Sequence, residues 1–295
     1  MADPSRPLAV LVNPAAAAGR ALAALPDVEA ELSRLGATFR VVETTSQDHA
    51  RTLAREAADA GETVGALGGD GFVGAIAGVL CGTDTPLAVL PGGRGNDLAR
   101  VLGIPTDPAG SVRVALEGVE RRIDVADANG TTYVGLASCG FDSECNRLAN
   151  ETKLVKGNLV YLYSASRVLA TWKPAEFEVV VDGERHQFRG YNVVVANSKA
   201  YGGGMYVVPQ AELDDGLLEV MVTTEKGKWP FIKGVLKTFN GSHVDDPALR
   251  FMRGREIEIK SDRPFEVYAD GDPVADLPVR IRVAERVLRV MVPAS

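Results

Sequence analysis

Two glycine-rich turns, each placed directly after a short apolar run, constrain the fold of this chain more than any other feature. The first turn, Gly68–Gly71, reads Gly-Gly-Asp-Gly and follows Thr63–Leu67; the second, Pro91–Gly95, follows Leu87–Leu90. A helical pattern comes after each turn. A strand, a glycine turn and a helix start in this order bring backbone N–H groups and the positive end of a helix dipole to one point. The sequence therefore predicts a cradle for an anion at each turn.

The residues before about 127 alternate short apolar runs with helical patterns. Further apolar runs lie at Leu8–Val12 and Phe39–Val42, and Val28–Leu35 has the spacing of a helix with one apolar face. Continuous apolar runs are typical of parallel strands that are buried on both sides. We therefore expect residues 1–127 to form an α/β domain with an open, mostly parallel sheet.

The pattern becomes strand-like after residue 127. The dipeptide Asp182-Gly183 between two apolar runs is typical of a two-residue β-hairpin. Helical insertions are expected at about 157–171 and about 228–240. We therefore expect an antiparallel β-sandwich over residues 128–279.

The last residues repeat an alternating apolar pattern. The runs Val279–Val283 and Leu288–Val292 predict a terminal hairpin. The tail over about 280–295 is also a candidate to return to the first domain.

Charge and cysteine content narrow the classes of function. The formal net charge of -7 argues against a general nucleic-acid binder, because phosphate neutralisation needs a basic face. Cys81, Cys139 and Cys145 form no Cys-x-x-Cys pair, which is typical of a reducing compartment. The chain contains neither a signal-peptide core nor an apolar run of about 18 residues. We expect a soluble, cytoplasmic protein without a nucleic-acid partner.

An acidic residue stands inside the first glycine turn. Asp70 would repel a bare phosphate, so its carboxylate is better explained by Mg²⁺ or by a metal-bound water. A tight turn with a capping aspartate explains the same residue without a ligand. In the second turn, Asn96 or Asp97 is a natural helix cap.

A third loop follows the first strand. It contains Asn13-Pro14 and, a few residues later, Gly19-Arg20. Because the carboxyl ends of parallel strands meet at one edge of a sheet, we expect this loop and the two glycine turns to converge on one ligand.

The ordered set of motifs resembles the diacylglycerol kinase catalytic-domain family, the bacterial lipid kinases related to sphingosine kinases. Each motif is weak alone, whereas the set spans nearly the whole chain in the right order. The motifs are Asn13-Pro14, Gly68–Gly71, Gly95–Arg100, Gly140–Asp142, Tyr201–Met205, Asp214–Leu218 and Asp270–Asp272. The resemblance implies a phosphofructokinase- and NAD-kinase-like first domain, a β-sandwich that takes the lipid substrate, and an ATP site between them.

The resemblance also implies three groups of site residues. Those around ATP would be Asn13, Arg20, Thr44, Thr45, Gly68, Gly69, Asp70, Gly71, Gly93, Arg94, Gly95, Asn96 and Asp97. Asp70, Asp97 and Asp124 would hold Mg²⁺-bound water, and Asp215 with the carbonyl groups of Glu212 and Leu217 would bind a structural Mg²⁺. Asp270 and Asp272 would stand at the catalytic-base motif, so they and Asp70 would be the catalytic residues.

The implied activity is transfer of the γ-phosphoryl group of ATP to a lipid hydroxyl, with diacylglycerol as the leading acceptor. Asp270 or Asp272 would take the proton of that hydroxyl. The acceptor stays open among diacylglycerol, monoacylglycerol, a sphingoid base, ceramide and an isoprenoid alcohol. The oligomeric state also stays open, a homodimer included.

Several residues depart from the family pattern, including Gly74 in place of an asparagine and Ala15-Ala16 in place of Ser-Gly. Phe72 and Arg94 replace threonines, Ala75 replaces a glutamate and Asp272 replaces the glutamate of Asp-Gly-Glu. The lost hydroxyls would remove hydrogen bonds to the nucleotide, which a guanidinium could replace by gripping phosphate oxygens. Two alternatives remain open: an NAD kinase-like enzyme, and a non-catalytic nucleotide- or lipid-binding relative.

A lysine-rich stretch is a candidate for contact with anionic lipid. Between Lys226 and Lys237 the chain has four lysines and no acidic residue, and aromatic side chains such as Trp229 lie among them. We expect transient peripheral attachment to a membrane here. A solvated helix face with core aromatics explains the same pattern.

Overall fold

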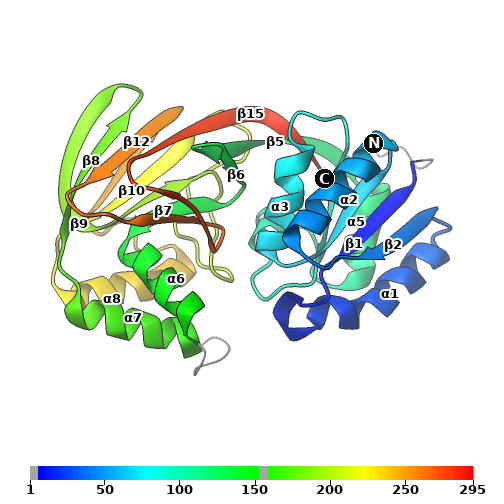
Figure 1. Ribbon diagram of the computed structural model, residues 1–295, viewed down its shortest axis with the longest axis horizontal. Coiled ribbons are helices and arrows are strands. Elements are labelled where there is room, and N and C mark those ends of the chain that lie inside the picture. The colour runs from blue at the N-terminus through cyan, green and yellow to red at the C-terminus, as the bar shows by residue number, and fades with distance from the viewer. Residues whose placement is uncertain (1–5, 153–158, 295) are drawn as a thin grey trace.

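Two lobes joined by a pair of long strands make up the structure, a computed structural model that describes residues 6–152 and 159–294 (Figure 1). Helices surround a sheet in the N-terminal lobe, whereas the C-terminal lobe is mostly strands with three helices gathered on one side.

The N-terminal lobe is built on parallel strands in the order β4-β3-β1-β2. Three of these strands are almost wholly buried: β1 (Leu8–Val12), β3 (Thr63–Gly68) and β4 (Leu87–Pro91). The edge strand β2 (Phe39–Glu43) is half-buried. The helical elements of this lobe are η1 (Ala16–Ala18), α1 (Arg20–Arg34), α2 (Gln47–Asp59), α3 (Asp70–Leu80), α4 (Asp97–Val101) and α5 (Pro108–Glu117).

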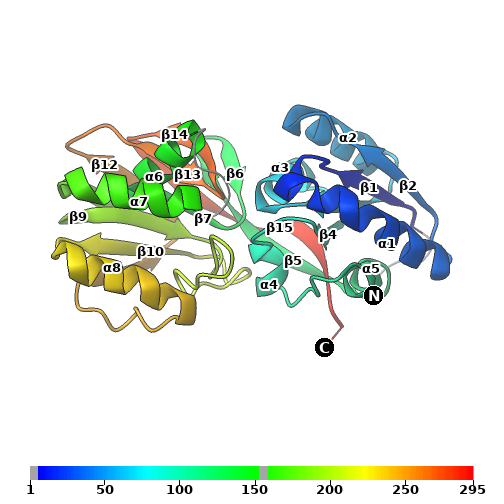
Figure 2. The same cartoon turned by 90° about the horizontal axis from the view of Figure 1, so that it is seen from below.

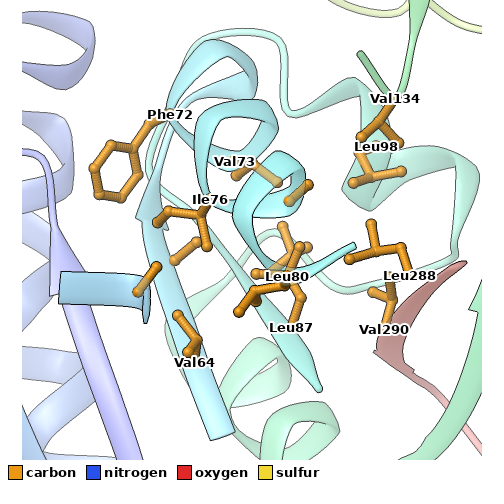
Figure 3. Close-up of a cluster of buried hydrophobic side chains, with 14 of the residues drawn as sticks. Val64, Phe72, Val73, Ile76, Leu80, Leu87, Leu98, Val134, Leu288 and Val290 are labelled. Carbon is orange, nitrogen blue, oxygen red and sulfur yellow. The ribbon is translucent and has the colours of Figure 1, made fainter. Parts of the chain in front are cut away.

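Helix α3 is packed into the main core of this lobe. Val73, Ile76 and Leu80 pack against strand residues such as Val64 and Leu87 (Figure 3). Because the core holds α3 along its length, its first residue, Asp70, is fixed at the edge of the sheet where β3 ends.

The C-terminal lobe is a β-sandwich-like arrangement of mostly antiparallel strands. Its sheet path runs β14-β13-β7-β9-β8-β12-β15, and β10 pairs with β9 and β11. The elements are β5 (Val119–Ala128), β6 (Thr131–Tyr133), β7 (Leu136–Gly140), α6 (Phe141–Glu151), α7 (Leu159–Thr171), β8 (Ala175–Val181), β9 (Glu184–Ala196), β10 (Leu218–Thr224), α8 (Lys228–Lys237), η2 (Thr238–Asn240), β11 (Leu249–Gly254), β12 (Glu256–Ser261), β13 (Glu266–Ala269), β14 (Asp272–Asp276) and β15 (Val279–Val292).

Strand β9 passes from one side of the sandwich to the other. Its first half pairs with β8 through the expected hairpin, in which Asp182 and Gly183 have φ values of 49° and 90°. Its second half pairs with β7 and β10. Gly190 lies at the change, and a Cβ there would be 2.2 Å from the carbonyl oxygen of Thr223. Only glycine permits the close approach that turns the strand.

An aromatic cluster holds the three helices of this lobe against the sheet. Phe141 of α6 is 4.8 Å from Phe231 of α8 and 5.5 Å from Trp172, which follows α7, between ring centroids. Tyr191 of β9 stacks on Phe231 at 4.2 Å. The helices therefore sit at fixed positions over one sheet face (Figure 2). The two expected helical insertions correspond to α7 and α8 with η2; residues 157–158 of the first lie outside the described residues.

The terminal hairpin expected at 279–292 is wrong. This segment is one strand, β15, which pairs with β12 and then along β5. Its register shifts between Ala284 and Leu288, where Arg286 has a φ of 51°. The break in the apolar pattern is thus a bulge and not a turn. Val290 pairs with Leu87 of β4, so the end of the chain extends the N-terminal sheet.

The expected fold class is confirmed: a mostly parallel α/β domain precedes a β-sandwich-like domain. Within the described residues, no helix combines the length and the apolar character required to span a bilayer.

Candidate functional site

A cavity of about 1150 Å³ runs from the edge of the parallel sheet into the C-terminal lobe. Its walls include the loop after β1, both glycine turns and the turn at Asp270. It then continues beneath α6 and α8, where apolar side chains such as Met221 and Phe231 line it. A polar, phosphate-sized end and a larger, partly apolar chamber therefore belong to one space.

The two glycine turns pack against each other backbone to backbone. A Cβ on Gly93 would be 2.5 Å from the Cα of Gly69, and a Cβ on Gly92 would be 2.8 Å from the Cβ of Ala21. Any larger residue would force the turns apart. The glycines therefore keep the ends of β3 and β4 close together at the cavity.

Asp70 links the two glycine turns. Its Oδ1 accepts hydrogen bonds from the backbone N–H groups of Asp97 at 2.6 Å and Leu98 at 3.4 Å. Burial and the neighbouring charge of Asp97 raise the pKa of the Asp70 carboxyl above its ordinary value. The carboxylate is thus fixed at the start of α4 beside a second acid.

Asp97 connects the two lobes. Its carboxylate accepts the backbone N–H groups of Gly203 at 3.0 Å and Gly204 at 2.8 Å. Both glycines have positive φ values, 88° and 101°, and belong to the motif Tyr201–Met205. These two hydrogen bonds explain how a motif in the C-terminal lobe contributes to a site at the edge of the N-terminal lobe.

Asp70 and Asp97 fit a magnesium ion bound through water. A Cβ on Gly95 would be 2.7 Å from Asp70 Oδ2 and 3.0 Å from Asp97 Oδ2, so both carboxylates lie beside the second glycine turn. A cation bound near both carboxylates would relieve the repulsion that, together with burial, raises the pKa of Asp70. Carboxylate oxygens and water are the ligands that Mg²⁺ prefers.

Asp124 does not join these two acids. It is fully buried outside the cavity lining, and its oxygens accept the backbone N–H groups of Gly216 at 2.7 Å and Arg286 at 2.6 Å. Asp124 thus ties together β5, the loop before β10 and the bulge of β15. The implied role beside Mg²⁺ is corrected to this structural role.

At the implied structural magnesium site, Asp215 has protein partners. Asp215 Oδ2 is 2.6 Å from an Arg253 guanidinium nitrogen, and its Oδ1 accepts the Leu217 N–H at 3.0 Å. The expected binding of Asp215 and of the carbonyl groups of Glu212 and Leu217 to a metal ion stays a prediction. Throughout residues 6–152 and 159–294, no three His, Cys, Asp or Glu side chains form a group that could hold one.

Asp270 is held by the backbone of a neighbouring segment. Its carboxylate accepts the N–H groups of Val134, Gly135 and Leu136, each at 3.1 Å. Burial raises the pKa of Asp270 to about 6, with a smaller contribution from the charge of Asp70, although the three N–H groups oppose the rise. Asp270 is therefore a carboxylate at neutral pH with an enhanced affinity for a proton.

Asp272 lies at the exposed mouth of the cavity. Gln47, the first residue of α2, donates a hydrogen bond to Asp272 Oδ2 at 3.3 Å. A Cβ on Gly71 would be 3.1 Å from the same oxygen, so Asp272 also borders the first glycine turn. Gln47 lines the cavity and was missed by the sequence reasoning, which placed the contacts of this loop at Thr44 and Thr45 instead.

The structure brings together about half of the expected site residues. Those that line the cavity are Asn13, Gly69, Asp70, Gly71, Gly93, Arg94, Gly95, Asp97, Asp270 and Asp272. Those outside its lining are Arg20, Thr44, Thr45, Gly68, Asn96, Asp124, Glu212, Asp215 and Leu217.

Three of the residues outside the lining have other partners. Thr44 donates its hydroxyl to the carbonyl oxygen of Val12, and Thr45 pairs with His49. Asn96 Oδ1 accepts the N–H of Gly93 at 2.9 Å and so shapes the second turn from behind.

Two family models match the chain. The diacylglycerol kinase catalytic domain matches residues 7–128, and the YegS C-terminal NAD kinase beta sandwich-like domain matches residues 135–292. The second model alone covers more than half of the chain. This chain belongs to the diacylglycerol kinase family of lipid kinases. The recognition made from the ordered motifs is therefore confirmed.

Relatives of this lipid kinase family match along most of the chain. A diacylglycerol kinase of Mycobacterium tuberculosis is 30% identical over 291 residues, which are 96% of this chain and 94% of the relative. A YegS-like lipid kinase of Pseudomonas aeruginosa is 30% identical over 266 residues, or 88% and 86% of the two chains. A Bacillus anthracis crystal structure described as a diacylglycerol kinase has a TM-score of 0.81 at 22% identity, covering 98% and 95%, and supports the fold.

The departures from the lipid kinase pattern have different structural consequences. Phe72 is 4% exposed and folds back over the first turn, where a Cβ on Gly68 would be 2.5 Å from its ring. Arg94 is exposed at the cavity, within reach of a ligand. Phe72 therefore packs against the first glycine turn, whereas Arg94 adds a cation where the second glycine turn borders the cavity.

The lysine-rich stretch is only partly a surface feature. Lys226 is 10% exposed in its side chain and forms a 2.7 Å ion pair with Asp246, so its expected contact with anionic lipid is corrected. Lys228 donates to the carbonyl oxygen of Ala170. Lys233 and Lys237 are exposed on α8.

Proposed function

We propose that this lipid kinase transfers the γ-phosphoryl group of ATP to the hydroxyl of a lipid alcohol, with diacylglycerol as the leading acceptor. The continuity of the cavity carries this proposal. It joins the glycine turns and the Asp70–Asp97 pair to Asp270, and beyond them to a chamber with apolar walls. A nucleotide and a lipid can therefore meet at Asp270 from opposite sides.

At the nucleotide end, backbone N–H groups of the glycine turns and the start of α3 would bind the phosphates. Arg94 would add a charge-assisted contact to a phosphate oxygen. Asp70 and Asp97 would hold Mg²⁺ through its water ligands, and the ion would neutralise charge on the transferring group. Positioning and charge neutralisation are the main requirements of phosphoryl transfer.

Asp270 is our choice for the general base. Three backbone N–H groups fix its orientation, and a pKa of about 6 leaves it ionised yet basic at neutral pH. Asp272 is more exposed and is held from the nucleotide side by Gln47. We propose that Asp272 positions residues at the rim of the site and does not take the proton.

The mouth of the lipid chamber would face a membrane. Val235, Leu236 and Phe239 line the cavity and are also exposed, at 41%, 64% and 57%. Trp229, which is 77% exposed, and the exposed Lys233 and Lys237 lie on the same helical segment. Apolar side chains flanked by lysines suit the surface of an anionic bilayer. We propose transient attachment there, on the cytoplasmic side where ATP is found.

A panel of acceptors in mixed micelles tests the proposed function. We expect label from the γ-phosphate of ATP in an extractable lipid, and no NADP from NAD under the same conditions. Labelling of NAD alone would favour an NAD kinase-like enzyme. Binding of ATP without transfer to any lipid alcohol would contradict the proposal and favour a non-catalytic relative.

A further inference from the structure

Gly74 lies in the interior of helix α3, at the wall of the cavity. It stands where the family pattern has an asparagine. A glycine inside a helix is less favourable than an alanine, because glycine loses more backbone freedom on folding. An interior glycine therefore usually meets a requirement of packing or of function.

Packing between the two lobes does not require a glycine at this position. A Cβ on Gly74 would be 3.7 Å from Asp270 Oδ2, which is an ordinary contact distance. Outside α3, no other atom of the described chain lies within 4 Å of that point. At the neighbouring Gly71, by contrast, a Cβ would be 3.1 Å from Asp272 Oδ2, which is tighter than ordinary packing. The space beside Gly74 is therefore open to the cavity and holds at least a methyl group.

This open space borders the carboxylate that we propose as the general base. The backbone N–H groups of Val134, Gly135 and Leu136 take three of the roughly four acceptor positions of the Asp270 carboxylate. One position is left for the hydroxyl of the acceptor. A Cβ on Gly135 would be 2.1 Å from Asp270 Oδ1, so backbone closes that side of the carboxylate. The side that faces Gly74 is open.

The space also lies at the distance expected for a carbon atom of the acceptor. A hydroxyl oxygen about 2.7 Å from a carboxylate oxygen places its own carbon about 3.6 Å from that oxygen. The point at which a Cβ on Gly74 would lie is 3.7 Å from Asp270 Oδ2. A carbon next to the reacting hydroxyl would therefore lie against the backbone of α3 at Gly74.

We propose that this lipid kinase phosphorylates a secondary hydroxyl, and that the space beside Gly74 receives the second carbon substituent of that alcohol. A primary alcohol has one carbon on its hydroxyl-bearing carbon and leaves the space empty, whereas a secondary alcohol has two. The inference rests on the proposed lipid kinase function and specifies the kind of hydroxyl that reacts.

The chemical step is the same for both kinds of alcohol. Asp270 takes the hydroxyl proton, and the hydroxyl oxygen forms a bond to the γ-phosphorus of ATP. The bond between that phosphorus and the bridging oxygen breaks, and ADP leaves with the electron pair. The space beside Gly74 therefore changes which alcohol fits and not how it reacts.

Two isomeric lipids test the proposal. 1,2-Di-O-oleylglycerol has a primary hydroxyl and 1,3-di-O-oleylglycerol has a secondary one, with the same chains and the same atoms. Their ether links prevent migration of the chains between positions. We expect kcat/KM to be about fourfold higher for the 1,3 isomer, as burial of one further CH₂ group provides. Equal values, or a preference for the 1,2 isomer, would overturn the proposal.

Refilling the space locates the preference. Gly74→Ala adds a methyl group there, and Gly74→Asn restores the residue of the family pattern. Each variant should lower the ratio of the 1,3 value to the 1,2 value by at least about tenfold, which is the discrimination that one methyl group gives in a fitted pocket. Because both lipids are assayed on one preparation, loss of folded protein scales both rates and leaves the ratio unchanged.

The matched control adds the same methyl group one turn further along α3. Gly78 does not line the cavity, and a Cβ there would meet Thr132 at an ordinary 3.6 Å. Gly78→Ala should keep the wild-type ratio. A preference for the 1,3 isomer that survives in both Gly74 variants, or that Gly78→Ala removes equally, would overturn the role of Gly74.

Binding separates failure of this inference from failure of the proposed function. If the wild-type protein phosphorylates neither isomer, the proposed function fails. The affinities of the two isomers are then compared by quenching of tryptophan fluorescence in mixed micelles, for the wild type and for Gly74→Ala. Tighter binding of the 1,3 isomer that Gly74→Ala removes would support the inference. Equal affinities for the wild type would contradict it.

Discussion

The carboxyl group of Asp270 shows how one residue acquires a chemical property from its surroundings. Asp270 has a φ of 50°, a conformation that aspartate tolerates better than most residues. This turn directs the carboxylate at three backbone N–H groups in a partly buried place. Burial outweighs those donors, which is why the pKa rises to about 6.

The raised pKa of Asp270 predicts a pH dependence of stability. The folded protein holds this proton up to about pH 6, whereas the unfolded chain releases it near 3.8, so the folded state binds more protons between these values. The free energy of unfolding should therefore fall as pH rises through this window, by up to about 3 kcal/mol from this group. Urea unfolding at a series of pH values measures the fall, which should shrink in Asp270→Asn. An equal fall in both proteins would exclude Asp270 as its source.

Gly135 should be required for the correct position of the Asp270 carboxylate. A Cβ at this position would be 2.1 Å from Asp270 Oδ1, so Gly135→Ala must displace Asp270. We expect lipid phosphorylation to fall by about 10²-fold, the usual cost of misplacing a reacting group. The matched control is Gly78→Ala on α3, whose Cβ would meet Thr132 at an ordinary 3.6 Å. Similar activities for the two variants would argue against a role of Asp270 at the reaction centre.

The sequence alone did not predict the roles of residues whose partners lie far away along the chain. Asp124 accepts N–H groups from residues 92 and 162 positions further along the chain. Asp215 and Lys226 likewise meet Arg253 and Asp246 only through the fold. The family pattern implied metal contacts for Asp124 and Asp215, and the lysine-rich composition predicted a lipid contact for Lys226, because sequence patterns record residue types and not their partners.

At the scale of elements, strong local patterns were sufficient for most strands and helices. The apolar runs before the glycine turns became β3 and β4, and Asp182-Gly183 became a hairpin turn. The end of the chain was misread because charged residues near Arg286 interrupt the apolar alternation as a turn would. Pairing with β5 on both sides of the interruption keeps β15 continuous, and no local pattern contains that information.

Helix α8 should bind anionic membranes through its exposed Lys233 and Lys237. Lys233→Gln combined with Lys237→Gln should weaken co-sedimentation with phosphatidylserine-containing vesicles roughly 30-fold, from about 1 kcal/mol per lysine. Phosphatidylcholine vesicles should bind weakly in both cases. The measurement is the bound fraction against lipid concentration.

The control variant removes two lysine charges at positions outside α8. Lys173, which follows α7, and Lys260 of β12 are exposed and lie outside α8. The double variant Lys173→Gln, Lys260→Gln should bind like the wild type. If it loses affinity as strongly as the α8 variant, binding depends on total charge and not on this helix.

At the scale of the whole molecule, the site depends on how the two lobes meet. Strands β5 and β15 run between the lobes, and Asp97 joins the second glycine turn to Gly203 and Gly204 (Figure 1). The resemblance anticipated a site between two domains, which agrees with this arrangement.

Transfer of radiolabelled γ-phosphate from ATP to lipid alcohols in mixed micelles tests the central claim most directly. We predict labelled lipid with the wild-type protein in the presence of Mg²⁺, a fall of at least about 10²-fold in Asp270→Asn, and a comparable fall in Asp70→Asn. Circular dichroism of each variant would confirm that it is folded. Unchanged turnover in both variants, or no labelled lipid from any acceptor with the wild-type protein, would contradict the account.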